Sequence, residues 1–130
     1  MLISINPPVN DDLKTFKEEQ VLISDLRPTE NSEWIERARI KGLTLLGLDL
    51  IPRVTRAQSM DILSSMATVS GYKAVLEAAM QLPRFFPMFM SAAGTIKPAR
   101  VLILGAGVAG LQAIAISRKL GAVVEVFDVR

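Results

Sequence analysis

A glycine-rich segment near the end of the chain carries the clearest chemistry. Its sequence, Gly105-Ala106-Gly107-Val108-Ala109-Gly110, follows the pattern G-x-G-x-x-G. In this pattern the first glycine permits a tight turn, the second lets a pyrophosphate approach the backbone, and the third lets a helix pack closely on the strand. The N–H groups of that helix's first turn lie at the positive end of the helix dipole and hold the phosphate charge. The segment therefore predicts a dinucleotide-binding turn.

An acidic residue stands where such a site needs one. Asp128 lies 18 residues after Gly110, close to the spacing at which a carboxylate accepts hydrogen bonds from the adenosine ribose. A carboxylate there repels the 2′-phosphate of NADP, so the predicted cofactor is NAD(H). Val129 and Arg130 complete the predicted cofactor-binding residues, and the charge of Arg130 would offset part of that repulsion. The alternative is a doubly wound fold in which the glycine turn is only structural.

The residues on either side of the turn predict the elements that position it. Val101–Leu104 is a continuous apolar run, which indicates a strand buried on both faces. A mostly apolar helix is predicted for Leu111–Leu120, and Gly121 ends it. Val123–Phe127 has the composition of a second strand, with Asp128 at its end. Together these segments predict the first β-α-β arm of a dinucleotide-binding domain.

Composition limits the remaining chemistry. The 130 residues include no cysteine and no histidine, which excludes disulfides, thiolate metal sites, cysteine nucleophiles and every histidine-dependent triad in this chain. The formal net charge is +2, and charges of both signs are interspersed, so nucleic acid is not a predicted partner. Half of the residues are hydrophobic, which is enough for a packed core.

The first half of the chain predicts short strands that alternate with helices. The predicted strands are Leu2–Ile5, Val21–Ser24 and Leu43–Leu50. Two predicted helices separate the strands. The first begins at Asp11 with Asn10 as its N-cap, and the second runs from Glu33 to Lys41 with Ser32 as its N-cap. Strands that alternate with helices favour a parallel sheet.

A long helix is predicted to join this part to the glycine turn. Thr55 and Gln58 have the spacing of a capping box, so the predicted helix runs from Arg56 to about Met80. Its many small residues indicate tight packing, or else the close approach of a flat ligand. Residues 91–98 are predicted to be a connecting loop. The predicted fold class is α/β, with the end of a Rossmann-like domain (1–55), a connecting helix and loop (56–98), and the truncated start of a Rossmann NAD-binding domain (99–130).

A second candidate site lies at the start of this helix. Its sequence is Asp49-Leu50-Ile51-Pro52-Arg53-Val54-Thr55-Arg56-Ala57-Gln58-Ser59-Met60-Asp61-Ile62-Leu63-Ser64-Ser65. In this stretch, and in Gly71-Tyr72-Lys73-Ala74 and Ala92-Ala93-Gly94-Thr95, the chain resembles the NAD(H)-binding alpha subunit of proton-translocating NAD(P) transhydrogenases. The related alanine dehydrogenases share the glycine turn. The resemblance covers Leu43 to Arg130 well and Met1 to Gln20 loosely.

The resemblance implies catalytic roles for four residues. Arg53 and Asp61 would orient the nicotinamide carboxamide, Ser64 would help to fix it, and Gln58 would reach the NADP(H) held by a partner component. Each residue also has a structural alternative. Gln58 completes the capping box, Asp61 and Ser64 share a solvated helix face, and Arg53 is a surface arginine. The absence of histidine fits the implied chemistry, because direct hydride transfer between two nicotinamides requires alignment rather than a proton donor.

The resemblance also implies partners and a location. The implied activity is hydride transfer from NADH to NADP⁺, coupled to proton translocation. The expected partners are an NADP(H)-binding component, a membrane-spanning proton-channel component and a second copy of the chain in a homodimer. The complex would lie at the cytoplasmic face of a bacterial inner membrane, although the 130 residues contain no predicted transmembrane segment.

Two departures from the family pattern accompany the resemblance. Residues Leu26 to Lys41 look like an insertion, and no function is assigned to them. The chain also stops at Arg130, just after the second strand of the nucleotide fold, so a fragment or one piece of a split chain is expected.

Two other functions compete with transhydrogenation. One is an NAD-dependent amino acid dehydrogenase of the alanine dehydrogenase type, whose chemistry needs acid–base groups. The other is a non-catalytic NAD-fold fragment.

Overall fold

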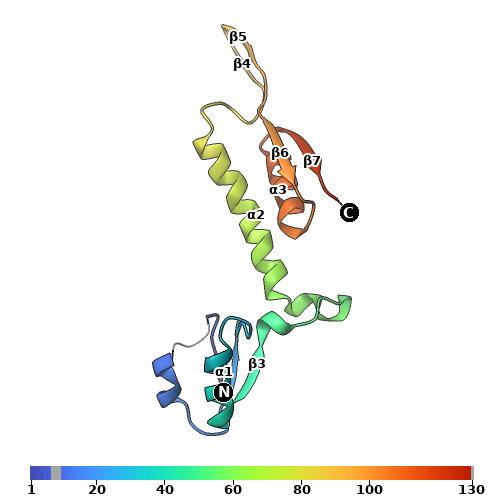
Figure 1. Cartoon of the computed structure of the whole chain (residues 1–130). Coiled ribbons are helices and arrows are strands. Elements are labelled where there is room, and N and C mark those ends of the chain that lie inside the picture. Colours follow the sequence, from blue (N-terminus) through green and yellow to red (C-terminus); the bar gives the residue numbers. More distant parts are fainter. Residues whose placement is uncertain (7–9, 130) are drawn as a thin grey trace. The chain divides into compact units, whose positions relative to one another are not determined.

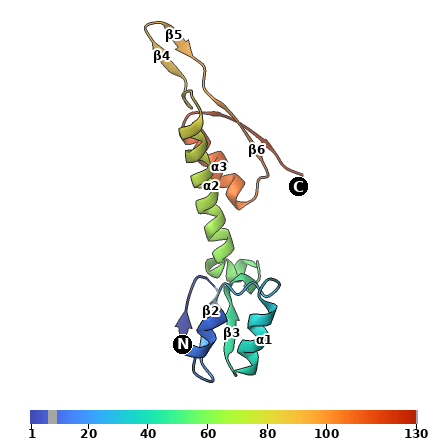
Figure 2. The same ribbon diagram turned by 60° about the vertical axis from the view of Figure 1, so that its left-hand side comes forward.

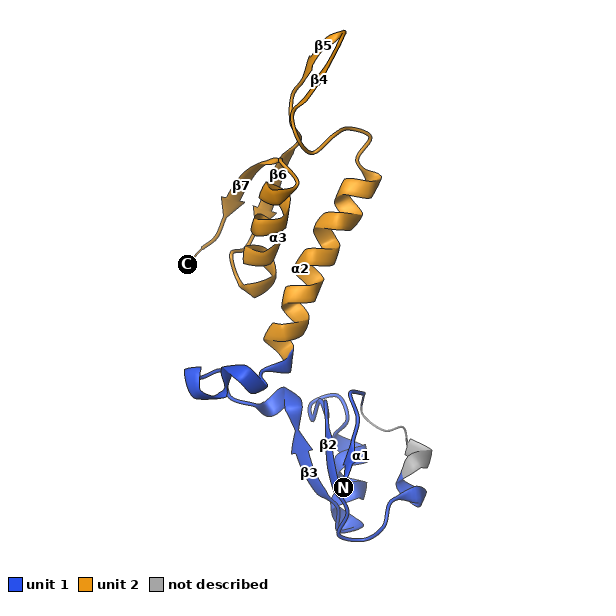
Figure 3. Cartoon of the chain, turned by 180° about the vertical axis from the view of Figure 1, so that it is seen from behind, with its two compact units in different colours: residues 1–62 blue, residues 63–130 orange. Residues whose placement is uncertain are grey.

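The chain folds into two compact units. The computed structural model describes residues 1–6 and 10–129, without the side chains of residues 10–12. Unit 1 comprises Met1–Ile62 and unit 2 comprises Leu63–Arg130, coloured separately in Figure 3. Both units combine helices with parallel strands, so the predicted mixed α/β class is confirmed. The finer division into residues 1–55, 56–98 and 99–130 stays a prediction.

Unit 1 contains a parallel sheet of three short strands, visible in Figure 2. They are β1 (Leu2–Ile3), β2 (Val21–Ser24) and β3 (Thr44–Gly47), in that spatial order. Neighbouring parallel strands need a crossover. The 3₁₀ helix η1 (Asn10–Thr15) lies in the first crossover and helix α1 (Ser32–Ile40) in the second. The predicted alternation of strands and helices is confirmed, although β1 is shorter than expected.

The core of unit 1 forms around the central strand. Leu22 on β2 is completely buried, and the other buried members of its cluster come mainly from the crossovers: Leu13, Phe16, Leu26, Trp34, Ala38 and Leu43. Trp34 and Ala38 lie four residues apart on α1, so they share one helix face. The segment from Leu26 to Lys41, to which the sequence assigned no function, therefore contributes the second crossover and part of this core.

The two predicted helix starts differ from the structure. The helix expected after Asn10 is the 3₁₀ helix η1, and the side chain of Asn10 lies outside the described part of the chain. Asn31, rather than Ser32, is the N-cap of α1. The Asn31 amide donates a hydrogen bond to the Leu26 carbonyl at 2.9 Å and makes no cap bond. Gly42 follows α1 with a φ of +79°, as expected of a residue that ends a helix.

Strand β3 ends earlier than predicted, because an acidic side chain binds backbone donors from another segment. The strand expected over Leu43–Leu50 stops at Gly47, and the 3₁₀ helix η2 (Leu48–Leu50) follows. The Asp49 carboxylate accepts hydrogen bonds from the N–H groups of Leu26, at 2.9 Å, and Arg27, at 3.1 Å. Such bonds compete with the sheet ladder and favour a turn.

This contact gives a stability prediction. Asp49→Ala should lower the free energy of unfolding of unit 1 by about 1–3 kcal/mol, since the N–H of buried Leu26 loses its acceptor. Urea denaturation followed by the fluorescence of Trp34, the only tryptophan, would measure the change.

The matched control is Glu36→Ala on α1. Among the described side chains, Glu36 binds only the exposed Arg39, whose hydrogen bonds lower the pKa of the Glu36 carboxyl. Exposed ion pairs contribute little, so the control should keep nearly the wild-type midpoint. Equal midpoints for the two variants would contradict a stabilising role for Asp49.

The long helix begins six residues later than predicted. Thr55–Met60 forms the 3₁₀ helix η3, and the α-helix α2 runs over Ile62–Gln81. The N-cap of η3 is Val54, without a side-chain cap bond, so the predicted capping box of Thr55 and Gln58 is not formed. Asp61 separates the two helices with an extended backbone, at φ −75° and ψ 94°. That conformation is typical of an N-cap residue, a position that aspartate favours.

The connection predicted as a loop over 91–98 is partly a β-hairpin. Strands β4 (Phe89–Ser91) and β5 (Gly94–Ile96) pair antiparallel through a two-residue turn. Gly94 has a φ of +123°, and the Ser91 hydroxyl oxygen accepts a bond from the Ala93 N–H at 3.3 Å. Glycine freedom and local side-chain bonding thus close a turn that the sequence pattern does not reveal.

The predicted β-α-β arm is confirmed in unit 2. Strand β6 (Arg100–Leu104), helix α3 (Val108–Lys119) and strand β7 (Val123–Phe127) follow one another, and the strands pair in parallel (Figure 1). The buried cluster is Val75, Phe86, Ala99 and Ile116. One expectation is wrong: β6 is not buried on both faces, since Leu102 is 61% and Leu104 75% exposed. Helix α3 packs on one face of the two strands.

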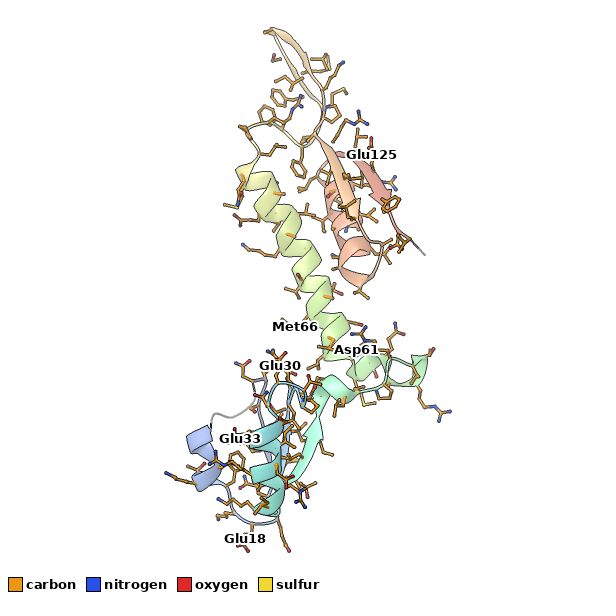
Figure 4. The ribbon with its side chains drawn as sticks, viewed as in Figure 1. Glu18, Glu30, Glu33, Asp61, Met66 and Glu125 are labelled. Carbon is orange, nitrogen blue, oxygen red and sulfur yellow. The ribbon has the colours of Figure 1, made fainter. Side chains whose placement is uncertain are left out.

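An ion pair links the first residue of β6 to the middle of β7. Arg100 on β6 binds Glu125 on β7, the residue labelled in Figure 4. The hydrogen bond from Arg100 to Glu125 raises the pKa of the guanidinium. Both side chains are largely exposed, and neither belongs to the glycine turn at the opposite end of β6.

Candidate functional site

The glycine turn connects β6 to α3, as predicted. Gly105 has a φ of +96°, a region that favours glycine, and its N–H donates to the Phe127 carbonyl at 2.7 Å. Gly107 is the N-cap of α3 and has an extended backbone. Apart from the chain neighbours, no described atom lies within 4 Å of where a Cβ would stand at either glycine. The backbone is therefore open to a ligand at both positions.

Gly110 has the packing role predicted for it. A Cβ there would overlap the carbonyl oxygen of Gly105 and lie 2.9 Å from the carbonyl carbon. These are backbone atoms, so they cannot rotate away from an added methyl group. Glycine at this position lets the first turn of α3 approach the strand end closely. Its contact with a cofactor stays a prediction.

The N-terminal turn of α3 presents backbone donors beside the glycine turn. The first N–H groups of an α-helix have no intrahelical acceptor, and those of Val108 and Ala109 belong to this turn. The intrahelical ladder begins where the Leu111 N–H donates to the Gly107 carbonyl at 2.8 Å. The partial positive charge of the helix end reinforces these donors. Anion binding is the chemistry that this arrangement favours.

The structure brings Asp128 to the glycine turn. Leu104 pairs with Phe127 in the parallel ladder, so Asp128 follows directly at the end of β7. Its half-buried carboxylate accepts a hydrogen bond from the Ala106 N–H. A negative charge therefore lies beside the glycine turn, whose backbone is open at Gly105 and Gly107. Val129 is 89% exposed, and Arg130 lies outside the described residues.

Three of the four residues assigned to the nicotinamide belong to unit 1. Arg53 is exposed after η2, and Gln58 is exposed on η3. Asp61 is only 7% exposed, and its side chain is labelled in Figure 4 beside the start of α2. The Asp61 N–H donates to the Gln58 carbonyl at 3.3 Å, which links these two residues through the backbone. The capping-box alternative for Gln58 and the solvated alternative for Asp61 are both wrong.

Ser64 belongs to unit 2 and lies in the first turn of α2. Its side chain is half-buried, and its carbonyl accepts a bond from the Thr68 hydroxyl at 3.1 Å. The glycine turn and Asp128 are in the same unit. The structure therefore describes two groups, one in each unit, and contact of either group with a nucleotide stays a prediction.

The described residues contain neither a helix suited to spanning a membrane nor a cluster suited to holding a metal ion. No helix there is both long and apolar enough to cross a membrane. The chain has no histidine or cysteine, so its aspartates and glutamates are the candidate metal ligands. Among the described residues, no three or more of these acidic side chains are arranged to hold a metal ion.

Two protein-family models together match nearly the whole chain. The model described as alanine dehydrogenase/PNT, N-terminal domain, matches residues 1–70, and the alanine dehydrogenase/PNT, C-terminal domain, matches residues 74–130. The chain belongs to the alanine dehydrogenase/PNT family. The glycine turn and Asp128 lie in the segment matched by the C-terminal model, and Arg53, Gln58, Asp61 and Ser64 lie in the segment matched by the N-terminal model.

Within this family, the chain is similar to transhydrogenase alpha subunits. It is 44% identical over its full length to NAD(P) transhydrogenase subunit alpha of Cereibacter sphaeroides, of which it covers 25%. It is 42% identical, again over its full length, to NAD(P) transhydrogenase subunit alpha of Haemophilus influenzae, of which it covers 25%. The chain thus spans about a quarter of the length of these relatives.

Two solved structures also match the chain, and the transhydrogenase matches it better than the alanine dehydrogenase does. A transhydrogenase from Sinorhizobium meliloti matches with a TM-score of 0.91 and 46% identity, over 99% of this chain and 36% of that one. An L-alanine dehydrogenase matches with a TM-score of 0.77 and 25% identity, over 99% of this chain and 35% of that one. The family fold is common to both, and the sequence is closer to the transhydrogenase.

Sequence reasoning missed one residue of this alanine dehydrogenase/PNT chain that lies against the candidate site. Gly71 is a buried glycine in the middle of α2, and a Cβ there would meet the backbone of Ala109 in the first turn of α3. The run of small residues on α2 was the available signal. Its explanation as tight helix packing is confirmed at this point.

Proposed function

We propose that this chain supplies a portion of the NAD(H)-binding component of a proton-translocating NAD(P) transhydrogenase. The observation that carries the proposal is the open backbone at Gly105 and Gly107, bordered by the Asp128 carboxylate at the N-terminus of α3. Identity of 42–44% to transhydrogenase alpha subunits supports it independently. Because the chain spans only about a quarter of those relatives, the activity of the complete protein is itself included in the proposal.

The glycine turn would hold the pyrophosphate of the nucleotide. The N–H groups of Val108 and Ala109 would donate to phosphate oxygens, and the bare Gly107 leaves room for that approach. Asp128 would accept hydrogen bonds from the adenosine ribose. Its charge would disfavour a 2′-phosphate, which favours NAD(H) over NADP(H) in this component. Val129 and Arg130 would complete the pocket.

The residues before and at the start of α2 would align the nicotinamide ring. When bound, NADH supplies the hydride, and NADP⁺ on a partner component accepts it. Arg53 and Asp61 would orient the carboxamide of NADH, and Ser64 would restrict its movement. Exposed Gln58 would extend to the partner's nucleotide. Holding two rings in alignment lowers the barrier without any proton donor from this chain.

The proposal extends to the assembly, and similarity to transhydrogenase alpha subunits supports the presence of other subunits. The partners would be an NADP(H)-binding component and a membrane-spanning proton-channel component, with a second copy of this chain in a homodimer. The complex would lie at the cytoplasmic face of a bacterial inner membrane. An alanine dehydrogenase activity is the weaker alternative, since the alanine dehydrogenase structure is 25% identical and the transhydrogenase 46%.

The experiment that tests the cofactor assignment replaces Asp128 in the complete alpha subunit. Asp128→Ala should weaken NADH binding by about 10- to 100-fold, since a charge-assisted hydrogen bond of about 1.5–3 kcal/mol is lost. Asp128→Asn keeps an acceptor for the Ala106 N–H and removes only the charge, so it should bind NADPH better than the wild type does.

Titration of nucleotide fluorescence would give both affinities. Glu125→Ala is the control, because it removes an exposed carboxylate of β7 that binds Arg100 and not the turn. Wild-type preference for NADPH, or unchanged NADH affinity in Asp128→Ala, would overturn the NAD(H) assignment.

A further inference from the structure

Gly71 occupies an unusual position for its residue type. It lies in the middle of the twenty-residue helix α2 and is buried. Glycine weakens a helix interior relative to alanine, since it has more backbone freedom to lose. Its φ is not positive, so the local backbone does not require glycine. The reason for glycine must therefore lie in what packs against it.

The neighbour of Gly71 is the backbone of α3. A Cβ at Gly71 would overlap the carbonyl oxygen of Ala109 and lie 2.9 Å from its carbonyl carbon and 3.0 Å from its Cα. Atoms of the main chain cannot move aside as a flexible side chain does. Helices α2 and α3 therefore approach each other backbone to backbone at this point, and any larger residue must separate them.

This contact acts on the residues that form the phosphate cradle. Ala109 contacts Gly71 on α2, and the next residue, Gly110, contacts the Gly105 carbonyl of the turn. Two consecutive residues of the first turn of α3 thus make close backbone contacts, one with α2 and one with the glycine turn. The position of the cradle relative to α2 depends on both contacts.

Ser64 lies on the same face of α2 as Gly71. The buried and half-buried residues of α2 include 64, 68, 71, 75 and 79, which recur every three or four residues and define one helix face. Ser64 precedes Gly71 by seven residues, two helical turns or about 10 Å along the axis. Further along this face, Val75 and Ala79 pack in the same cluster as Ile116 and Ala113 of α3. Ser64 therefore projects from the side of α2 that faces α3.

We propose that Gly71 is a positioning residue that sets the separation between the phosphate cradle of α3 and the nicotinamide end of α2. The inference rests on the proposed function, because it assumes that the cradle and Ser64 hold the two ends of one nucleotide. Gly71 would not touch the nucleotide itself; it contacts the cradle through the Ala109 backbone and acts only by letting the helices approach. A displacement of about 1 Å far from the reacting atoms can slow a reaction by on the order of a hundredfold.

The test compares Gly71→Ala with Ser70→Ala in the assembled transhydrogenase. Both variants place alanine in the middle of α2, but Ser70 is exposed whereas Gly71 is buried. Gly71→Ala should slow hydride transfer to NADP⁺ by about 10- to 100-fold at saturating NADH, with NADH affinity within about threefold of wild type. Ser70→Ala should match the wild type in both measurements.

A distance measurement gives a readout that does not depend on activity. The chain has no cysteine, so Ala74→Cys on α2 and Ala115→Cys on α3, both at exposed positions, allow a pair of spin labels to be attached. The mean distance between the labels should increase in the Gly71→Ala background and stay constant in the Ser70→Ala background. If Gly71→Ala does not fold, Ala113→Val enlarges a side chain of α3 that packs against the cluster containing Val75 of α2. It should also separate the two helices and produce the same split between transfer and binding.

Three outcomes would overturn the inference. They are wild-type transfer despite a longer label distance, an unchanged distance, and equal losses of binding and transfer together with a lower melting temperature. The last would make Gly71 a purely structural residue. A wild-type complex that neither binds NADH nor reduces NADP⁺ would instead refute the proposed function, so the two failures are distinguishable.

Discussion

Replacing Gln58 with alanine is expected to slow hydride transfer to NADP⁺ by about a hundredfold while NADH binding stays near normal. Gln58 is exposed on η3 and, among the described residues, its side chain has no hydrogen-bond partner. Its proposed contact is with the partner's nucleotide, so NADH keeps its contacts with the glycine turn and Asp128. The variant should also stay folded, because Gln58 does not cap η3.

The measurements are NADH titration and steady-state transfer with the partner components present. Ser59→Ala is the control, as it changes the next exposed residue of η3 without touching the proposed contact. Equal losses of binding and transfer would indicate a uniform contribution to affinity rather than a role in the transfer step. A fully active Gln58→Ala variant would remove Gln58 from the proposed site.

Two glycine-to-alanine substitutions in the glycine turn should both weaken NADH binding, but for different physical reasons. Gly107→Ala meets no described atom within 4 Å and has a negative φ of −72°, so its stability should stay within about 0.5 kcal/mol of wild type. The added methyl group would stand where the phosphate approaches. Each lost phosphate hydrogen bond costs about 1.5–3 kcal/mol, so NADH affinity should fall on the order of a hundredfold.

Gly110→Ala, by contrast, should damage the fold as well. Its Cβ would overlap the Gly105 carbonyl, and overpacking of this kind costs about 1–3 kcal/mol. The strand–turn–helix arrangement would have to shift, which also displaces the donors of Ala109. Thermal melting and NADH titration of both variants in the complete subunit separate the two effects. A destabilised Gly107→Ala, or a Gly110→Ala as stable as wild type, would contradict this account.

The local pattern of the sequence was sufficient for the nucleotide-binding arm. The apolar run of β6, the three spaced glycines and the acid after β7 predicted the order of the elements and the position of Asp128, and the structure has them there. The reason is that each signal acts over a few residues. A glycine turn, a helix stop and a short apolar strand are encoded in neighbouring residues and need no information from distant segments.

The same local reasoning also predicted the parallel sheet of unit 1. Strands and helices alternate there because parallel neighbours require crossovers, and this alternation is legible in the order of apolar and capping residues. It did not predict where β3 ends. That boundary depends on Asp49 binding Leu26 and Arg27, more than twenty residues earlier in the chain.

Tertiary contacts also decided the start of α2 and the place of Gly71. A capping-box pattern at Thr55 predicted a continuous helix, but the buried, extended Asp61 interrupts it. Side-chain burial is a property of the packed chain, so a local pattern cannot foresee it. The small residues of α2 indicated that something packs closely, without saying what. Only the fold identifies the first turn of α3 as the partner of Gly71, because residues 38 positions apart become neighbours only after packing.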